Sequence, residues 1–316
     1  MLKAGNNHYQ DSRTEMRIVV IGAGGVGGCF GGELARAGHD VTMFARGAHR
    51  DAMRQRGIVV RTPDGEFTAR VGATDDVAQL PDAELAIVAV KSYSLADVIP
   101  VVRAVAERGA DVVPMLNGVT AADEMIAGGV PAGRVLGGIA RISAARIDPG
   151  VVERRSTFQS VVVGELRGGS SERASAIADV FRGARIEART SDAMEVELWQ
   201  KYVFITAMAA VCGLTRTSIG PVREAPGGRR LIDRAVDEVV AVARARGIAL
   251  PDDEGPRTSA YIGTLPPAMK PSFLLDVESG GPTELETLSG AVARFAADAG
   301  IASPVHETVR TVLSVR

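Results

Sequence analysis

A short apolar segment that runs directly into a cluster of glycines constrains this chain more than any other feature. Residues 16–21 (MRIVVI) form a continuous apolar run of the kind found in central strands of parallel sheets. The six residues that follow are Gly22, Ala23, Gly24, Gly25, Val26 and Gly27. Residues 25–37 then have a helical pattern that Gly38 can terminate, and residues 40–45 (DVTMFA) predict a second strand. This order of strand, glycine turn, helix and strand predicts a βαβ unit.

The spacing of these glycines matches the pattern G-x-G-x-x-G and gives the turn a specific chemistry. Gly22 allows a tight turn, Gly24 leaves room for a pyrophosphate, and Gly27 allows the helix to pack closely on the strand. The negative ligand would lie at the positive end of the helix dipole. The pattern alone is common, but its place between a strand and a helix favours a dinucleotide site over a glycine-rich helix start without a ligand.

The end of the second predicted strand distinguishes between the two nicotinamide dinucleotides. An acidic residue at this place would bond the ribose 2′-hydroxyl of NAD and repel the 2′-phosphate of NADP. The chain instead places Arg46 here and has no acid before Asp51. An arginine can pair with the 2′-phosphate through its planar fork of donors, although Arg46 could also be a solvated surface charge. We therefore expect NADP(H) as the cofactor.

The remaining pattern predicts two domains of different composition. Strand-like and helix-like segments alternate up to about residue 190 and predict an α/β domain with a doubly wound, Rossmann-type parallel sheet. Its further segments are a hairpin at 57–72, strands at 85–90 and 111–116, helices at 95–108 and 171–182, and a β-rich stretch at 135–165. We expect a disordered arm over residues 1–15, the NADP-binding domain over 16–190, and an all-helical substrate domain over 191–316.

Long helical patterns dominate the second predicted domain. They cover residues 192–212, 229–246, 252–262 and 284–299, followed by a short helix that begins at Ser303-Pro304. Thr283 and Glu286 have the spacing of a capping box at the start of the fourth helix.

Composition excludes several classes of function. The chain has 316 residues, a net charge of −2 and no long basic run, which argues against a nucleic-acid partner. Cys29 and Cys212 have no companions at metal-ligand spacing, so we expect no metal and two buried apolar cysteines. The N-terminal stretch lacks the apolar core of a secretory signal, and the apolar run at 202–214 is too short to span a bilayer. We expect a cytoplasmic protein, and homodimer formation stays open.

A reductase that uses such a cofactor needs a cation or a general acid near the ketone oxygen, because negative charge grows there. Lys91 and Asn117 each follow a predicted strand, at the edge where ligands bind in open parallel sheets. Lys201 lies in the first long helix, where it could also simply extend from the edge of a buried face into solvent. Ser272 and Glu284 could bind substrate, or could cap or begin a helix.

The chain resembles the ketopantoate reductase (2-dehydropantoate 2-reductase) family from Met16 onward. The similar elements, in the family's order, are the glycine loop 22–27, Arg46, Val90-Lys91, Asn117-Gly118, Ala144-Ala145-Arg146 before Pro149-Gly150-Val151, Trp199-Gln200-Lys201, and Pro271-Ser272 through Asp276 to Thr283-Glu284. The resemblance implies NADPH-dependent reduction of ketopantoate to pantoate, with the substrate held between the two domains.

The resemblance also implies roles for single residues. Lys201 would protonate the developing alkoxide, and Asn117 would orient both substrate and nicotinamide. Ser272 would bind the substrate carboxylate, and Glu284 would lie beside the cofactor and the catalytic lysine. Lys91 and Ala144 are implied as further cofactor or cleft contacts.

The chain departs from the family pattern on the helix that carries Lys201. The family has asparagines four and eight residues after the lysine, where this chain has Ile205 and Ala209. Loss of an amide leaves a substrate hydroxyl unpaired, so a more apolar 2-oxo acid is an alternative substrate. Two further alternatives are a D-2-hydroxyacid dehydrogenase and a catalytically silent NADP sensor. Retention of Lys201 and Glu284 argues against the sensor.

Overall fold

The computed structural model describes residues 15–315, so the arm predicted at 1–15 lies almost wholly outside the described residues. The first part of the chain forms a five-stranded parallel sheet in the order β5-β2-β1-β6-β7. Its strands are β1 (Arg17–Ile21), β2 (Asp40–Phe44), β5 (Gly72–Thr74), β6 (Leu85–Val88) and β7 (Asp111–Pro114). Strand β1 is central, with β2 and β5 on one side of it and β6 and β7 on the other. The order therefore reverses between β1 and β6, which opens a crevice at their carboxyl ends.

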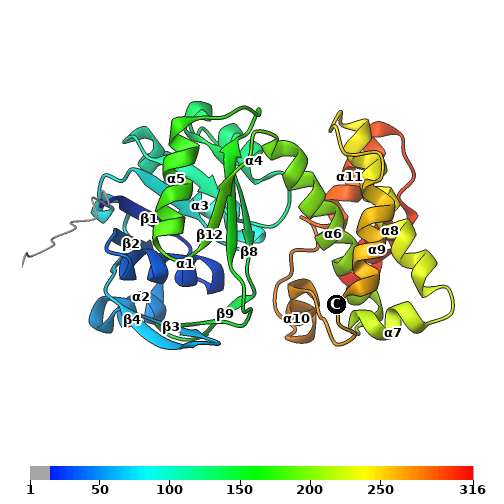
Figure 1. Cartoon of the computed structure of the whole chain (residues 1–316), viewed down its shortest axis with the longest axis horizontal. Helices are drawn as coiled ribbons and strands as arrows, with labels where there is room; N and C mark the ends of the chain where they lie inside the picture. Colours follow the sequence, from blue (N-terminus) through cyan, green and yellow to red (C-terminus); the bar gives the residue numbers. More distant parts are fainter. Residues whose placement is uncertain (1–14, 316) are drawn as a thin grey trace, which may run out of the picture.

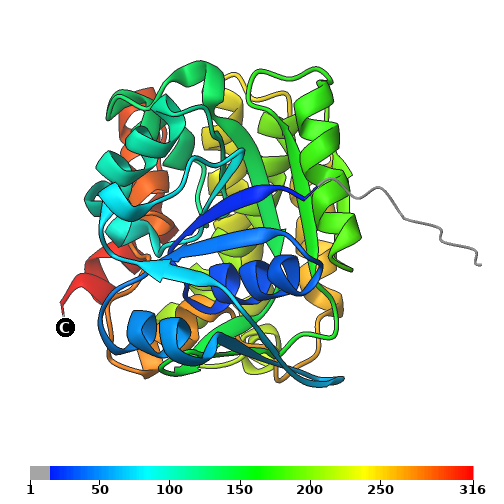
Figure 2. The same cartoon turned by 90° about the vertical axis from the view of Figure 1, so that its left-hand side faces the viewer.

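Helices cover both faces of this sheet, as the doubly wound pattern predicts (Figure 2). Ile18 and Val20 of β1 pack with α1 (Gly25–Arg36), whereas Val19 and Ile21 face the opposite side. That second side contains α3 (Leu95–Glu107) and α4 (Ala121–Ala127). Alternate residues of β1 thus enter two different cores, which explains why the strand is apolar at every position after Arg17.

The β-rich stretch after residue 135 does not add a strand to the parallel sheet but contributes to two further sheets. A four-stranded sheet has the order β4-β3-β10-β9, and a three-stranded sheet has the order β12-β11-β8. Their strands are β3 (Ile58–Thr62), β4 (Gly65–Ala69), β8 (Leu136–Arg141), β9 (Ala144–Asp148), β10 (Val151–Arg154), β11 (Ser160–Glu165) and β12 (Glu187–Thr190). The pairs β9–β10 and β8–β11 are antiparallel. Only Pro149 and Gly150 separate β9 from β10, which allows a hairpin but no parallel crossover. Helix α5 (Glu172–Gly183) precedes β12.

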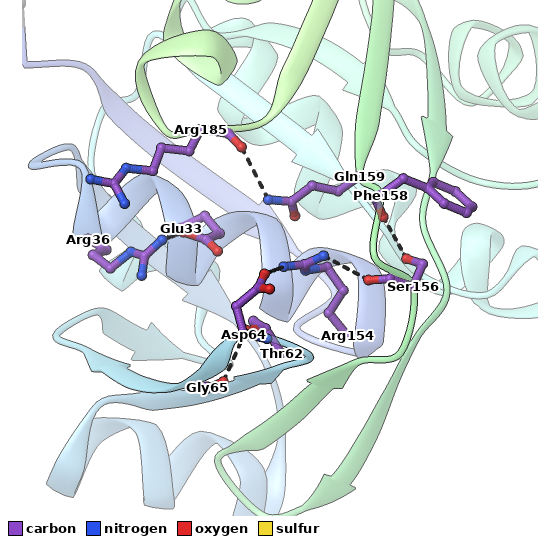
Figure 3. Close-up of polar contacts among 10 residues, drawn as sticks. All are labelled: Glu33, Arg36, Thr62, Asp64, Gly65, Arg154, Ser156, Phe158, Gln159 and Arg185. Carbon is purple, nitrogen blue, oxygen red and sulfur yellow. Dashed lines mark hydrogen bonds and ion pairs between the residues drawn. The ribbon is translucent and has the colours of Figure 1, made fainter.

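The predicted hairpin at 57–72 is confirmed as β3 and β4, and a buried arginine ties it to the neighbouring strand (Figure 3). Arg154 at the end of β10 is only 7% exposed. Its guanidinium donates to the carbonyl oxygen of Ser156 at 2.7 Å and contacts the Asp64 carboxylate at 3.4 Å. The hairpin turn and the loop after β10 are therefore held through one side chain.

Helix α2 (Gly47–Arg56) was not predicted from the sequence. It is short, and only His49, Ala52 and Met53 are buried, so it lacks a continuous apolar stripe. Arg46 is its N-cap residue and Gly57, with a φ of 80°, ends it.

The second domain consists of helices around a long central one (Figure 1). They are α6 (Met194–Thr215), α7 (Ile219–Glu224), α8 (Gly228–Ala245), α9 (Glu254–Thr264), α10 (Ser272–Glu278), α11 (Ser289–Ala299) and α12 (Pro304–Ser314). Helix α6 extends beyond the apolar run at 202–214, and its length and composition alone would let it cross a membrane. Most of that stretch is buried inside the protein, as in the core helix of a helical domain. Cys29 and Cys212 are both buried, as expected.

The fourth predicted helix begins later than its sequence pattern indicates. Helix α11 starts at Ser289 rather than at Glu284, and its N-cap residue is Leu288. The predicted capping box of Thr283 and Glu286 is therefore wrong, because residues 284–288 form turns that face the first domain. Ser303 is the N-cap residue of α12 and Pro304 is its first residue, as predicted. The first backbone N–H groups of that helix donate to the Glu238 carboxylate of α8 rather than to Ser303.

We predict that His306 makes the stability of the fold depend on pH. The ring is fully buried between Ser289 and Ala235, and burial lowers the pKa of His306 to about 4. An unfolded histidine titrates near 6.5, so its contribution is complete above that pH and is lost as the pH falls toward 4. His306→Gln should therefore remove about 2 kcal/mol of the stability difference between pH 7 and pH 5. Urea unfolding of both proteins at both pH values measures it, and equal pH slopes would contradict the prediction.

Candidate functional site

The glycine loop between β1 and α1 has the geometry that a pyrophosphate requires. Gly22 has a φ of 98°, and a Cβ atom added there would lie 2.6 Å from Val90. A Cβ atom on Gly27 would lie 2.0 Å from the carbonyl oxygen of Gly22. A Cβ atom on Gly24 would meet no atom within 4 Å, so this glycine faces open space at the start of α1. Close packing thus requires two of the glycines, and the third leaves room for a ligand.

Ala144 at the start of β9 lies directly against this loop. The ideal Cβ position of Gly25 is 2.4 Å from the Ala144 carbonyl oxygen. Any side chain at position 25 would push β9 away. The prediction that Ala144 contacts the cofactor stays a prediction, but its backbone is part of the wall behind the loop.

Lys91 lies in the crevice between the two domains, three residues beyond the end of β6 rather than directly at it. Its ammonium group is 2.6 Å from the Asp276 carboxylate of α10 and 3.9 Å from Glu284. Partial burial alone would lower the pKa of Lys91, but the two carboxylates outweigh it and raise the pKa. Lys91 is therefore a permanent cation that joins the sheet domain to the helical domain.

Glu284 is the point where the polar contacts between the domains converge. It is only 4% exposed, and it lies in the turns that precede α11. The Asn117 side-chain amide donates to one carboxylate oxygen at 3.1 Å, and the backbone N–H of Ser92 donates to the other at 3.3 Å. A buried carboxylate needs such partners, and here they come from the ends of two different strands of the parallel sheet.

Lys201 lies in the second turn of α6 and points to the sheet domain. Its ammonium group donates to the carbonyl oxygen of Ala140 in β8 at 3.0 Å. Burial of the ammonium group and the charge of nearby Arg141 lower the pKa of Lys201 to about 8, against the opposing effect of Glu284. A lysine poised near neutral pH can both hold and release a proton, which distinguishes it from a surface lysine.

The short segment 140–144 contacts Lys201 at one end and the glycine loop at the other. Lys201 contacts Ala140 in β8, and Gly25 packs against Ala144 in β9, only four residues later. The structure thus brings Lys91, Asn117, Lys201 and Glu284 together at the crevice beside the loop 22–27.

Two predicted site residues lie away from this cluster. Arg46 is exposed at the end of β2, and no ion pair of its guanidinium occurs within residues 15–315. Ser272 is exposed in the first turn of α10, whose N-cap is Pro271, so Ser272 is not the cap. It lies one helical turn before Asp276, which pairs with Lys91, and therefore on the side of α10 that faces the crevice.

Sequence reasoning missed three residues that hold the cluster in place. The Thr287 hydroxyl donates to the Ser92 hydroxyl at 2.6 Å, and the buried Tyr202 hydroxyl donates to the backbone oxygens of Thr287 and Leu288. The Thr287 methyl group also fills the space beside Gly118, where a Cβ atom would lie 2.5 Å away. These residues have no motif of their own, but Ser92 and Tyr202 are each the chain neighbour of a predicted site residue.

A cavity of about 590 Å³ lies beside the cluster rather than in it. Its lining includes Gly118, Val119, Gly138, Leu198 and Trp199, but none of Lys91, Asn117, Lys201 and Glu284. Its lining also includes charged side chains, among them Glu165, Arg173 and Glu195, but Lys201, whose pKa is lowered to about 8, lies outside it.

The contrast between Gly24 and Gly27 makes a prediction about the loop. Gly24→Ala should leave the thermal unfolding midpoint unchanged but weaken dinucleotide binding at least roughly tenfold, since the methyl group would enter the ligand's space. Gly27→Ala should instead destabilise the fold, by about 1–3 kcal/mol, because its methyl group meets a backbone oxygen. Calorimetric binding and thermal unfolding of both variants test this pair. A Gly24→Ala protein that binds like the parent would refute the role assigned to Gly24.

Comparison with known proteins gives a consistent assignment. A family model described as Ketopantoate reductase PanE/ApbA matches residues 18–168, and the model of its C-terminal part matches residues 193–316. The oxidoreductase YkpB of Bacillus subtilis (strain 168) is 31% identical over 299 residues, which is 93% of this chain and 96% of its own. A 2-dehydropantoate 2-reductase of Halobacterium salinarum is 33% identical over 298 residues, with the same coverage.

A solved structure shares both domains. The crystal structure of 2-dehydropantoate 2-reductase from Methylococcus capsulatus is 27% identical, covers 95% of this chain and 96% of its own, and superposes with a TM-score of 0.85. With the glycine loop and the polar cluster in the order already described, the chain belongs to the ketopantoate reductase family and is an oxidoreductase.

Proposed function

We propose that this protein reduces a 2-oxo acid with NADPH, and that the substrate is ketopantoate in the pathway to pantothenate and coenzyme A, in the cytoplasm. The observation that carries the proposal is Lys201, whose ammonium group lies at the crevice with a pKa lowered to about 8 and with Glu284 nearby. The family assignment supports the reaction class, and the geometry supports the roles of the single residues.

The residues at the crevice fit a nicotinamide dinucleotide. The open space at Gly24 and the free amides at the start of α1 suit a pyrophosphate, with Ala23, Gly25 and Val26 in the same loop. The exposed guanidinium of Arg46 suits the 2′-phosphate that distinguishes NADPH from NADH. Asn117, Glu284 and Lys91 would lie on the nicotinamide side of the site. When bound, the cofactor supplies the hydride that reduces the substrate ketone.

The reaction develops negative charge on the ketone oxygen, and Lys201 is placed to neutralise it. In the proposed mechanism the Lys201 ammonium group exchanges its contact with the Ala140 carbonyl for the substrate oxygen and donates a proton to it. Glu284 favours the protonated form of Lys201 and also holds the amide of Asn117, which would orient the substrate. Ser272 would bind the carboxylate end of the substrate from α10.

The apolar side chains that follow Lys201 on α6 support a second candidate substrate class. Ile205 is half-buried one turn beyond the lysine, and Ala209 is buried one turn later. Neither can bond the hydroxyl group of ketopantoate, so a more apolar 2-oxo acid, or the D-2-hydroxy acid in the reverse direction, is the second candidate. The silent sensor fits less well, because the lowered pKa of Lys201 has no use in a protein that only binds.

We expect substitution of Lys201 to abolish the proton transfer without loss of NADPH binding. Lys201→Ala should lower kcat with ketopantoate by about 10²–10⁴-fold. Because the acid must be protonated, the parent rate should fall above pH 8, and Glu284→Gln should shift this fall to lower pH. Stopped-flow NADPH oxidation between pH 6 and 10 measures both effects. Unchanged turnover in Lys201→Ala, with NADPH still bound, would overturn the mechanism.

Substitution of Ile205 should reveal which substrate the crevice prefers. Ile205→Asn restores an amide one turn beyond Lys201 and should raise kcat/KM for ketopantoate relative to 3,3-dimethyl-2-oxobutanoate, which lacks only the hydroxyl group, by about tenfold. Ile205→Leu keeps the face apolar and is the matched control. If both variants keep the parent's ratio of the two substrates, position 205 does not contact the substrate.

A further inference from the structure

His49 is a buried polar residue that the proposed reaction does not use. It lies in the first turn of α2, three residues after Arg46, and is only 5% exposed. Its Nε2 atom is 2.7 Å from the carbonyl oxygen of Ala23 in the glycine loop. The backbone N–H of Gly150, in the turn between β9 and β10, donates to its Nδ1 atom at 2.8 Å. The ring therefore contacts two backbone segments that are far apart in the chain.

These two contacts fix the tautomer of the ring. A backbone N–H can only donate, so Nδ1 must be the unprotonated acceptor, and Nε2 must carry the hydrogen that it donates to Ala23. Burial lowers the pKa of His49 against the opposing effect of the hydrogen bond to Ala23, and Arg146 on β9 lowers it further. The neutral ring thus satisfies a loop carbonyl and a turn amide at the same time.

The surrounding contacts make this link short and rigid. The Arg56 side chain at the end of α2 donates to the carbonyl oxygen of Pro149 at 2.6 Å. Gly150 has a φ of 76°, and a Cβ atom there would lie 2.9 Å from Ala52 of α2. Helix α2 therefore lies directly against the β9–β10 turn, and through His49 against the glycine loop.

His49 thereby connects the two elements that would hold the phosphates of the cofactor. Ala23 belongs to the loop proposed for the pyrophosphate, and Arg46, proposed for the 2′-phosphate, is the residue at which α2 begins. We infer that His49 is a positioning residue that sets the distance between these two anion sites and so the preference for NADPH over NADH. The inference rests on the proposed cofactor site.

Three variants separate the two hydrogen bonds of the ring. His49→Gln keeps an N–H donor at the reach of Nε2, His49→Asn keeps an oxygen acceptor near Nδ1, and His49→Ala keeps neither. Gln55→Ala, on the exposed side of the same helix, is the matched control. The dissociation constants of NADPH and NADH are measured by nicotinamide fluorescence, and kcat and KM by NADPH oxidation.

The parent and Gln55→Ala should bind NADPH more tightly than NADH. His49→Ala should reduce this preference by about tenfold, raise the KM for NADPH and leave kcat at saturating NADPH within about twofold. The Gln and Asn variants should lose part of the preference, and they carry the test if His49→Ala does not fold.

Two results would overturn the inference in distinguishable ways. If the His49 variants weaken the binding of NADPH and NADH by the same factor, or leave the binding of both unchanged, the ring has no role in the preference. The proposed cofactor site is then unaffected. If the parent itself binds NADPH no better than NADH, the assignment of Arg46 fails, and the role of His49 in that preference fails with it.

Discussion

A buried carboxylate needs hydrogen-bond donors, and Glu284 of the helical domain takes its two donors from the sheet domain. Its partners Ser92 and Asn117 follow two adjacent strands of the parallel sheet, β6 and β7, and its own segment is held by Tyr202 of α6. Leaving such a group without partners would cost several kcal/mol, so the two domains are held in one relative orientation. The residues proposed to carry the chemistry are thus among the residues that join the domains.

The glycines of α1 meet a second constraint, which concerns packing rather than ligand binding. Gly31 faces Met43 of the parallel sheet, whereas Gly28 and Gly32 face Val152 and Val60 of the four-stranded sheet. A Cβ atom at any of the three would lie within 2.6 Å of these side chains. Helix α1 is therefore enclosed between two sheets that approach it closely. This enclosure brings β9 of the four-stranded sheet against the glycine loop, which is the proposed cofactor site.

Sequence patterns predict the parts of this fold that follow from local chemistry. The βαβ unit, its glycine loop, the hairpin and the position of Lys201 on a long helix agree with the structure, since each depends on periodicity or on glycine geometry within a few residues. Helix α2 and the late start of α11 could not be predicted in this way. Helix α2 has too few buried residues to give a helical pattern. Helix α11 starts late because Glu284 accepts hydrogen bonds from the other domain instead of beginning the helix.

The hydrogen-bond partners of His49 and Thr287 depend on contacts between distant segments. His49 bridges Ala23 and Gly150, which are 26 and 101 residues away along the chain, and Thr287 contacts Ser92 at a separation of 195 residues. No local pattern encodes such pairs. Periodicity indicates that a residue is buried in a turn or helix, but the identity of its partner follows only from the way the sheets and helices pack.

The charges around the crevice explain how an anionic substrate could be accepted there. Lys91 is neutralised by its contacts with Asp276 and Glu284, so it adds little attraction for a second carboxylate. Lys201 and Arg141 lie close enough for the arginine to lower the pKa of the lysine, and within residues 15–315 Arg141 forms no ion pair. An incoming carboxylate would relieve this repulsion and would raise the pKa of Lys201, so that the lysine is more fully protonated with substrate bound than without it. The acid would then be charged most completely when the ketone is in place, which matches the order that a reduction requires.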